Sequence, residues 1–333
     1  MFMVSIIKLK TIKGFVTNKI IIMYKIILNT LLAGSIMLLT SCSGNKSVKL
    51  IESWKVGTSS GLFTDFSQKE FDEFKSNGID CIEIGSGLFG KKTQAEKEAL
   101  VGDIKQKADK AGITIWSIHL PFSRVFDIST LNDEDRNNMI RECSDMMALC
   151  KPLNPQKYVI HASAEPIPDQ ERADRLRNSI ASLKILNETA KKQNAQLAVE
   201  CLPRTCLGNT AAELLSIVNE VGNGIGIGFD SNHLLQEKPE EFVAKVGNNI
   251  TTVHMSDYDG LDERHWLPGT GIINWTNVVA ELVKSGYKGP FMFESSRRKP
   301  TSGGTADLSK LTTKELYSSF QEIKDNYIKS LDY

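Results

Sequence analysis

All five histidines of this chain lie at or just after the end of a short apolar run that is typical of a β-strand. Four of the runs read WSIHLPF, YVIHAS, GIGFDSNH and TTVHMSDYD, and a fifth histidine follows in ERHWLPGTG. Structural histidines would scatter over helices and loops, whereas imidazole is the commonest metal-binding side chain in proteins. The pattern therefore predicts that one site gathers the five histidines: His119, His161, His233, His254 and His265.

Carboxylates end several apolar runs in the same way. Glu200 closes QLAVE, Asp230 closes GIGFD, and Glu294 closes FMFE. Neighbouring strands lie about 5 Å apart, so these three carboxylates and His254, at the ends of four successive strands, can converge on one ion. Such a ligand set suits Mn²⁺, Mg²⁺, Co²⁺ or Zn²⁺, and the residue types do not choose among them.

Each of these residues also has an ordinary structural role to weigh against a chemical one. Asp230 could cap the turn that follows it, and His161 could be a hydrogen-bonded core histidine. Glu83, in CIEIG, could simply pair with a neighbouring lysine. The joint pattern favours a shared metal site, because a charged or metal-ligating residue ends seven of the eight apolar strands.

Strand-like and helix-like segments alternate strictly from residue 54 onward. Apolar strand patterns cover residues 54–59, 81–85, 113–120, 157–163, 196–203, 224–230, 251–257 and 290–295. Helical patterns cover residues 65–78, the stretch that ends at Gly112, and residues 132–151, 169–194, 211–221, 239–247, 274–286 and 311–331. Such alternation predicts βαβ units around a parallel sheet.

Eight such units predict an α/β protein with a single (β/α)₈ TIM barrel over residues 54–331. The strands are continuous apolar runs, as expected when both faces of a sheet are covered. An open doubly wound sheet is the alternative, and it is disfavoured because no glycine-rich fingerprint follows the first strand.

The N-terminal residues predict a targeting segment instead of part of the fold. The first 42 residues carry five lysines and no acidic residue, and an apolar run leads into Leu39-Thr40-Ser41-Cys42. This resembles a bacterial lipoprotein signal, so we expect residues 1–42 to be the signal segment, with a lipid on Cys42, and residues 43–53 to be a tether. A transmembrane anchor is the alternative, but the run is short for a span. The expected location is the periplasmic face of a membrane.

Five segments of the chain resemble one known family: VECLPR, GFDSNH, VHMSDYD, RHWLPGTGIINW and FMFES. Together they look like the xylose isomerase-like barrel superfamily, and within it the sugar (phosphate) isomerase/epimerase branch. The resemblance covers about residues 54–331. Its most specific part is the pattern RHxxPGTGxIxW at residues 264–275.

The resemblance implies roles for named residues. It implies that a divalent metal is bound by Glu200, Asp230, His254 and Glu294. Glu200 and Glu294 would be the acid/base pair, moving a proton through a metal-bound enediolate. The expected substrate contacts are His233, Arg264, His119, His161 and His265.

The sequence departs from the family pattern at one position. Ketose 3-epimerases of this branch usually carry a second glutamate six residues after the ligand on the fifth strand, and Cys206 occupies that position here. This argues against a free-ketohexose 3-epimerase.

A rival within the superfamily is the AP endonuclease, which builds a three-zinc cluster. Matching ligand types occur here at His119, His161, Glu263 and His265. Beyond residue 42, however, the chain carries 35 basic and 40 acidic residues and no basic stripe. No nucleic-acid partner is therefore expected.

The expected export narrows the substrate, because sugar phosphates are cytoplasmic and the chain has no Walker-type or GxGxxG phosphate loop. The sequence predicts a metal-dependent isomerase or epimerase of an unphosphorylated sugar or keto-sugar. The alternatives are a lyase or hydrolase that acts on a 3-keto-glycoside through the same enediolate, the nuclease, and a non-catalytic sugar-binding lipoprotein. The expected partners are the sugar substrate and a membrane that the protein contacts only through its lipid. A homo-oligomer is also possible in principle, and the sequence does not decide it.

Overall fold

The computed structural model describes residues 45–295 and 309–332. The chain divides into two units, residues 1–49 and residues 50–333, and the fold described below is that of the second unit. Within these described ranges, no helix is long and apolar enough to cross a membrane.

The predicted signal segment 1–42, including Cys42, lies outside the described residues. In the segment predicted as a tether, residues 45–52 are helical and the Ile51 side chain is fully buried.

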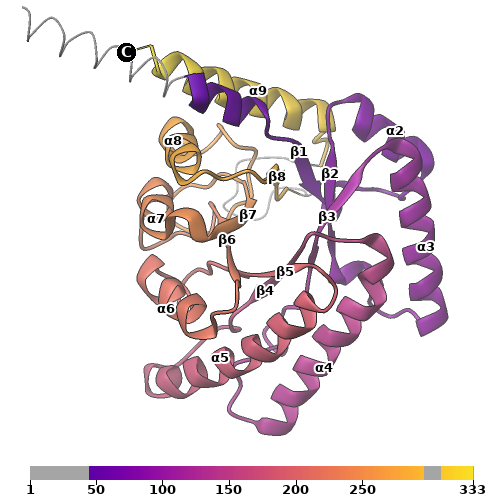
Figure 1. Cartoon of the computed structure of the whole chain (residues 1–333), viewed down its shortest axis with the longest axis vertical. Coiled ribbons are helices and arrows are strands. Elements are labelled where there is room, and N and C mark those ends of the chain that lie inside the picture. Colours follow the sequence, from indigo (N-terminus) through magenta and orange to yellow (C-terminus); the bar gives the residue numbers. More distant parts are fainter. Residues whose placement is uncertain (1–44, 296–308, 333) are drawn as a thin grey trace, which may run out of the picture. The chain divides into compact units, whose positions relative to one another are not determined.

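Eight strands form one parallel sheet that curls into a barrel, with the helices outside it (Figure 1). Neighbours pair in the order β7-β6-β5-β4-β3-β2-β1-β8. The strands are β1 (Val56–Ser59), β2 (Cys81–Gly85), β3 (Thr114–His119), β4 (Lys157–His161), β5 (Gln196–Glu200), β6 (Gly226–Asp230), β7 (Ile250–His254) and β8 (Phe291–Phe293). The predicted (β/α)₈ barrel is confirmed.

The barrel closes between β7 and β8 through very little backbone pairing. The Met255 amide donates to the carbonyl of Met292 at 2.8 Å, and the Glu294 amide donates to the carbonyl of Met255 at 3.2 Å. A single bridge, between Met255 and Phe293, joins the two edges.

Eight helices of the described residues match the predicted helical patterns and differ from them only at their ends. They are α2 (Gln68–Ser76), α3 (Gln94–Ala111), α4 (Asp133–Cys150), α5 (Asp169–Lys191), α6 (Ala211–Val221), α7 (Pro239–Val246), α8 (Trp275–Ser285) and α9 (Thr313–Ser330). Short 3₁₀ turns extend some connections: η1 (Ser60–Leu62), η2 (Ser86–Phe89), η3 (Lys151–Leu153) and η4 (Gly247–Asn249).

Local sequence sets where the helices begin and end. At the start of α3, the Thr93 side chain accepts from the Glu96 amide while the Glu96 carboxylate accepts from the Thr93 amide, which forms a capping box. The same helix ends at Gly112, whose φ of 70° is the left-handed conformation that glycine adopts without strain.

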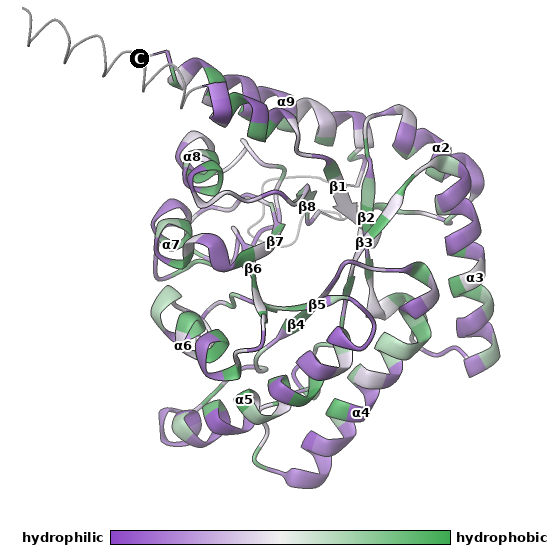
Figure 2. Ribbon diagram, viewed as in Figure 1, coloured by the Kyte–Doolittle hydropathy of each residue, from purple (hydrophilic) through white to green (hydrophobic). Residues whose placement is uncertain are grey.

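The core lies between the strands and the inner faces of the helices. Each helix carries both hydrophobic and hydrophilic residues (Figure 2). On α8 the apolar face buries Val278, Val279 and Leu282 completely. Complete burial of such a side chain stabilises the fold by about 1.5–3 kcal/mol, so packing of these faces fixes the ring of helices and the rim of loops above the strands.

Candidate active site

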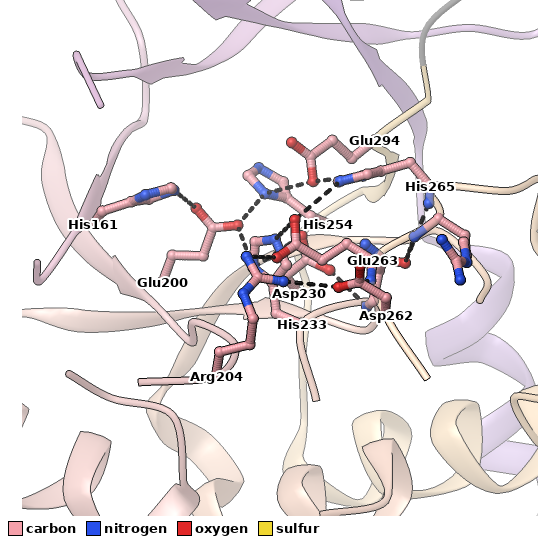
Figure 3. Close-up of polar contacts among 12 residues, drawn as sticks. His161, Glu200, Arg204, Asp230, His233, His254, Asp262, Glu263, His265 and Glu294 are labelled. Carbon is pink, nitrogen blue, oxygen red and sulfur yellow. Dashed lines mark hydrogen bonds and ion pairs between the residues drawn. The ribbon is translucent and has the colours of Figure 1, made fainter. Parts of the chain in front are cut away.

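The carboxyl ends of the strands bring the predicted residues to one end of the barrel. The last residues of β3, β4, β5, β6 and β7 are His119, His161, Glu200, Asp230 and His254, and Glu294 follows β8 directly. Figure 3 shows side chains from these different elements pointing toward one another. Parallel strands end at the same rim, which explains why residues far apart in sequence meet here.

Four of these residues form a compact group of possible metal ligands. Ligand atoms of Glu200, Asp230, His254 and Glu294 all lie within 4.8 Å of one another. Two ligands on opposite sides of one ion lie about 4 Å apart, because each bond is about 2 Å long. Small side-chain adjustments would therefore place all four around one divalent ion.

Two carboxylate oxygens of this group provide an independent test of that fit. Asp230 Oδ2 and Glu294 Oε2 are both buried and form no hydrogen bond, and the histidine nitrogens that pair with them lie 3.5 to 3.6 Å away. Burial of an unsatisfied polar atom is costly, and buried charges are normally paired or coordinate metals. A cation between these two oxygens would satisfy both.

The pKa values of Asp230 and Glu294 are also consistent with a cation-binding site. Burial, together with the nearby negative charge of Glu200, raises the pKa of Asp230 to about 7. Burial and the negative charge of Asp230 likewise raise the pKa of Glu294 to about 7. A bound divalent cation would favour the ionised forms and lower both pKa values.

Two further groups of possible ligands flank the first. One combines His119, His161 and Glu200, so that Glu200 belongs to two groups. The other combines His233, Glu263 and His265. The histidines predicted as substrate contacts thus also have the geometry of metal ligands.

Glu200 is the hub of the histidine contacts. Its Oε2 is 3.0 Å from His119 Nε2 and 3.1 Å from His161 Nε2, and its Oε1 is 3.0 Å from His254 Nδ1. Although burial alone would raise it, the pKa of Glu200 lies well below its usual value because of these imidazoles. Burial acts to lower the pKa of His119, but the Glu200 carboxylate outweighs it and raises the pKa to about 9.

Glu83 has a different partner from the one its sequence suggested. It is buried on β2, where Ser117 Oγ donates to its Oε2 at 2.7 Å and His254 Nε2 lies 3.0 Å from the same oxygen. The alternative of a pairing with a neighbouring lysine is therefore wrong. The signal was present in the sequence, since Glu83 lies in an apolar strand, but its partner is on the seventh strand.

The loop between β7 and α8 is held by Asp257, a residue that the sequence reasoning did not single out. Its carboxylate accepts from the Gly269 amide at 2.9 Å, the Ile273 amide at 3.2 Å and Trp275 Nε1 at 2.8 Å. At Gly271 a Cβ atom would lie 2.3 Å from Asp257 Oδ1, so only glycine fits there. The PGTGxIxW half of the motif therefore has a structural role: it surrounds the buried carboxylate of Asp257 and donates hydrogen bonds to it.

The other half of the motif presents residues to the site. Asn232 Oδ1 accepts from the amides of Arg264 and His265, at 2.8 and 3.2 Å. The Arg264 side chain donates from Nε to Asp259 Oδ2 at 2.7 Å. Among the described residues, Arg264 is not one of those that line the cavity described next, and its predicted contact with substrate stays a prediction.

A cavity of about 260 Å³ opens over the ligand groups. Its floor includes four of the five histidines and Glu294. Its upper wall includes Phe122, Arg204 and Cys206. Cys206, at the position where the sequence was expected to depart from the ketose 3-epimerase pattern, lines the cavity, and burial raises its thiol pKa to about 12.

Arg204 joins three loops at the edge of this cavity. Its guanidinium makes two hydrogen bonds to Glu165, both at 2.7 Å, and contacts Asp262 at 2.8 Å and Glu263 at 2.6 Å. Figure 3 shows the guanidinium lying beside the carboxylates of Asp262 and Glu263. No periodicity in the sequence marks these loop residues, so their contacts could not be predicted.

The fold and the site together place the chain among known proteins. Residues 71–315 match the family described as Xylose isomerase-like TIM barrel, and the chain belongs to this family.

Curated relatives are distant. An inosose isomerase of Halalkalibacterium halodurans is 25% identical over 243 residues, which cover 69% of this chain and 82% of that protein. An uncharacterized protein of Methanocaldococcus jannaschii is 29% identical over 186 residues, which cover 54% of this chain and only 63% of that protein.

Solved structures share the fold at low identity. A D-psicose 3-epimerase from Clostridium cellulolyticum H10 has a TM-score of 0.68 at 19% identity, covering 83% of this chain and 99% of that one. A 3-keto-D-glucoside 4-epimerase from E. coli has a TM-score of 0.65 at 16% identity, covering 82% of this chain and 99% of that one.

Proposed function

We propose that this protein is a divalent-metal-dependent isomerase or epimerase of an unphosphorylated sugar or keto-sugar. The observation that carries the proposal is the group of Glu200, Asp230, His254 and Glu294, with two buried carboxylate oxygens that form no hydrogen bond. The likeness to an inosose isomerase and to sugar 3- and 4-epimerases supports the same class of reaction.

The four ligands define what a bound ion would contribute. A divalent ion held by these residues would polarise a substrate carbonyl and acidify the adjacent C–H bond. Glu294 lines the cavity and its side chain is 23% exposed, so it can reach a substrate C–H directly. A general base has to be ionised to accept a proton, and a bound divalent cation would favour the ionised form of Glu294.

Glu200 supplies the second half of the proton transfer. Its buried carboxylate is held by His119, His161 and His254, which fix its position relative to Glu294. In this proposal Glu294 removes a proton to give an enediolate, and Glu200 returns a proton that it receives from the imidazolium of His119, 3.0 Å away. Return to the opposite face epimerises the carbon, and return to the neighbouring carbon isomerises the sugar.

The charges around the cavity favour a neutral substrate. Arg204 is already paired with Glu165, Asp262 and Glu263, so its positive charge is more than balanced. Arg124 also lines the cavity, but Glu165, Asp262, Glu263 and Glu294 outnumber the two arginines, so a phosphorylated sugar would approach an excess of negative charge. This supports an unphosphorylated sugar.

The test is incorporation of solvent deuterium. Metal-loaded protein is incubated in D₂O with a panel of aldoses, ketoses, inososes and 3-keto-glucosides, and exchange at a substrate carbon is followed by NMR. Exchange together with a new stereoisomer supports the proposal. Bound metal without exchange in any of these substrates would overturn it and leave a sugar-binding protein.

Phe122 offers the sugar an aromatic wall. Its ring is 51% exposed and lies 4.7 Å from the His119 ring and 4.6 Å from the His161 ring, between centroids. We expect Phe122→Ala to raise KM about 10-fold and to change kcat much less, because lost apolar contact of roughly 1.4 kcal/mol affects ground state and transition state alike. Val125→Ala on the same loop is the matched control, since Val125 is 86% exposed. An unchanged KM in Phe122→Ala would contradict this role.

The two extra ligand groups favour a second candidate, a lyase or hydrolase of a 3-keto-glycoside. Several ions close together can stabilise the negative charge on a leaving alkoxide, which proton transfer alone does not require. The likeness to a 3-keto-D-glucoside 4-epimerase is compatible with that substrate. Release of the aglycone from a 3-keto-glucoside distinguishes this candidate from an epimerase, and cleavage of abasic DNA by protein with three zinc ions would revive the nuclease.

We further propose that the mature protein is anchored by a lipid on Cys42 at the periplasmic face of a membrane. The lysines and apolar run before Leu39-Thr40-Ser41-Cys42 support this location. Cells expressing the full chain should incorporate labelled palmitate into the protein, and Cys42→Ala should remove the label and release the protein from membranes. Absence of label from the unaltered chain would exclude the anchor.

A further inference from the structure

We infer that Glu83 is a positioning residue that fixes the ring of His254 as a metal ligand. The inference rests on the proposed metal site and assigns a role to a carboxylate that the proposed reaction does not use.

Glu83 is not a member of the four-residue ligand group. Its side chain is 2% exposed, and it is not among the residues that line the cavity. Glu83 and Ser117 are direct partners in the pairing of β2 with β3, and Ser117 Oγ donates to Glu83 Oε2 at 2.7 Å. Neighbouring strands therefore hold the carboxylate in place.

The same oxygen of Glu83 faces His254 across the barrel interior. His254 Nε2 lies 3.0 Å from Glu83 Oε2, while Nδ1 faces Glu200 Oε1 at 3.0 Å and Glu294 Oε2 at 3.6 Å. The two ring nitrogens thus point at different carboxylates. Only Nδ1 points into the four-residue ligand group.

Carboxylates face both ring nitrogens of His254 at 3.0 Å, so the tautomer would be decided when Nδ1 ligates a metal. A neutral imidazole carries one N–H, and Glu83, as an acceptor, would then hold that proton on Nε2. The lone pair is then on Nδ1, where a metal would need it. Outer carboxylates that orient a ligating histidine typically improve metal affinity 10- to 100-fold.

The surroundings of Glu83 point to such a role rather than to an ordinary ion pair. Within the described residues, no lysine or arginine forms an ion pair with it, and His254 is its ion-pair partner. A buried carboxylate is costly unless hydrogen bonds and a positive group offset its desolvation. An imidazole bound to a divalent ion would be such a group.

The experiment uses Glu83→Gln, which keeps the size and one acceptor oxygen but removes the charge. After treatment with a chelator and dialysis, the affinity for Mn²⁺ and for Zn²⁺ is measured by competition with a chromogenic chelator. We expect 10- to 100-fold weaker binding than in the unaltered protein. In parallel, ¹⁵N–¹H correlation spectra of the Zn²⁺-loaded proteins should show the Nε2–H proton of His254 farther downfield in the unaltered protein, where the Glu83 carboxylate accepts from it, than in Glu83→Gln.

The controls separate this inference from the proposed function. Glu70→Gln removes another buried carboxylate, one that accepts from the backbone amides of Thr64, Asp65 and Phe66 just before α2, and should leave metal affinity unchanged. If the unaltered protein binds neither metal, the proposed metal site fails. If it binds metal, and Glu83→Gln binds equally well with an unchanged His254 Nε2–H resonance, the role of Glu83 is overturned.

Discussion

Glu294→Gln should abolish exchange of the substrate C–H proton with solvent while leaving the barrel folded. Glutamine occupies almost the same volume and keeps an oxygen that can bind a cation, but it cannot accept a proton from carbon. Removal of a general base typically lowers the rate 10²- to 10⁴-fold. Because Glu294 lies just beyond β8 and its side chain is 23% exposed, the change should affect proton transfer far more than core packing.

The measurement compares deuterium incorporation per turnover in the unaltered protein and in Glu294→Gln, each loaded with metal to the same occupancy. Glu281→Gln is the control, because Glu281 pairs with Lys284 on the outer helix α8. Exchange at the unaltered rate in Glu294→Gln would assign the base to another residue. Loss of exchange with metal content unchanged would place the defect in the proton transfer itself.

The metal-free protein should lose stability as the pH rises from 5 to 8, and divalent metal should restore it. The carboxyls of Asp230 and Glu294 have pKa values raised to about 7, so the folded state binds their protons more tightly than the unfolded chain. Such groups stabilise the fold relative to the unfolded state at low pH, and the stability falls as the pH passes from the unfolded pKa to the folded one.

His119 and His254, whose pKa values are raised, change stability in the same direction, whereas His161, whose pKa is lowered by burial, acts the opposite way. The pKa of His119 is raised to about 9, so its contribution is complete below its ordinary pKa and is lost as the pH rises toward 9. The lowered pKa values of Glu83 and Glu200 matter only in more acidic solution, where those carboxylates become protonated. Between pH 5 and 8 the metal-free site therefore destabilises the protein progressively.

Bound metal reverses this trend because it replaces the protons. A ligand present at 1,000 times its Kd stabilises the folded state by about 4 kcal/mol, which corresponds to a rise in Tm of roughly 10 °C for a domain of this size. The stabilisation should be larger at pH 8 than at pH 5, since metal competes with protons for the ligands.

Thermal melts at pH 5, 6.5 and 8, with EDTA or with Mn²⁺, check this expectation. The double variant Asp230→Asn with Glu294→Gln should show a flatter pH dependence without metal and little gain from Mn²⁺. A Tm that is independent of pH and of metal in the unaltered protein would contradict the proposed site.

The fold could be predicted because local and periodic signals agree along the chain. The apolar pattern at residues 211–221 coincides with α6, where Thr210 caps the first turn and Gly222 follows the last residue. Strand ends were equally clear, since apolar runs that stop at a histidine or carboxylate have to stop at the rim of a parallel barrel. The gathering of Glu200, Asp230, His254 and Glu294 followed from that topology alone.

What could not be predicted depends on which rim residues face each other across the barrel. Glu83 and His254 are separated by 171 positions and meet only because β2 and β7 face a common interior. The partners of Arg204 depend on the course of three loops, which have no periodic pattern. The Arg264 side chain points toward Asp259 within the same loop, and no pattern in the sequence indicates that orientation.

The thin closure between β7 and β8 changes how the metal should act on the whole molecule. His254 is the last residue of β7, and Glu294 directly follows β8. An ion bound by both residues would therefore link the two edge strands of the sheet. Without it, the amides of Met255 and Glu294 are held by two hydrogen bonds beside a short strand. Fluctuations that separate the two edges would begin there, and an ion bound by both His254 and Glu294 would oppose them.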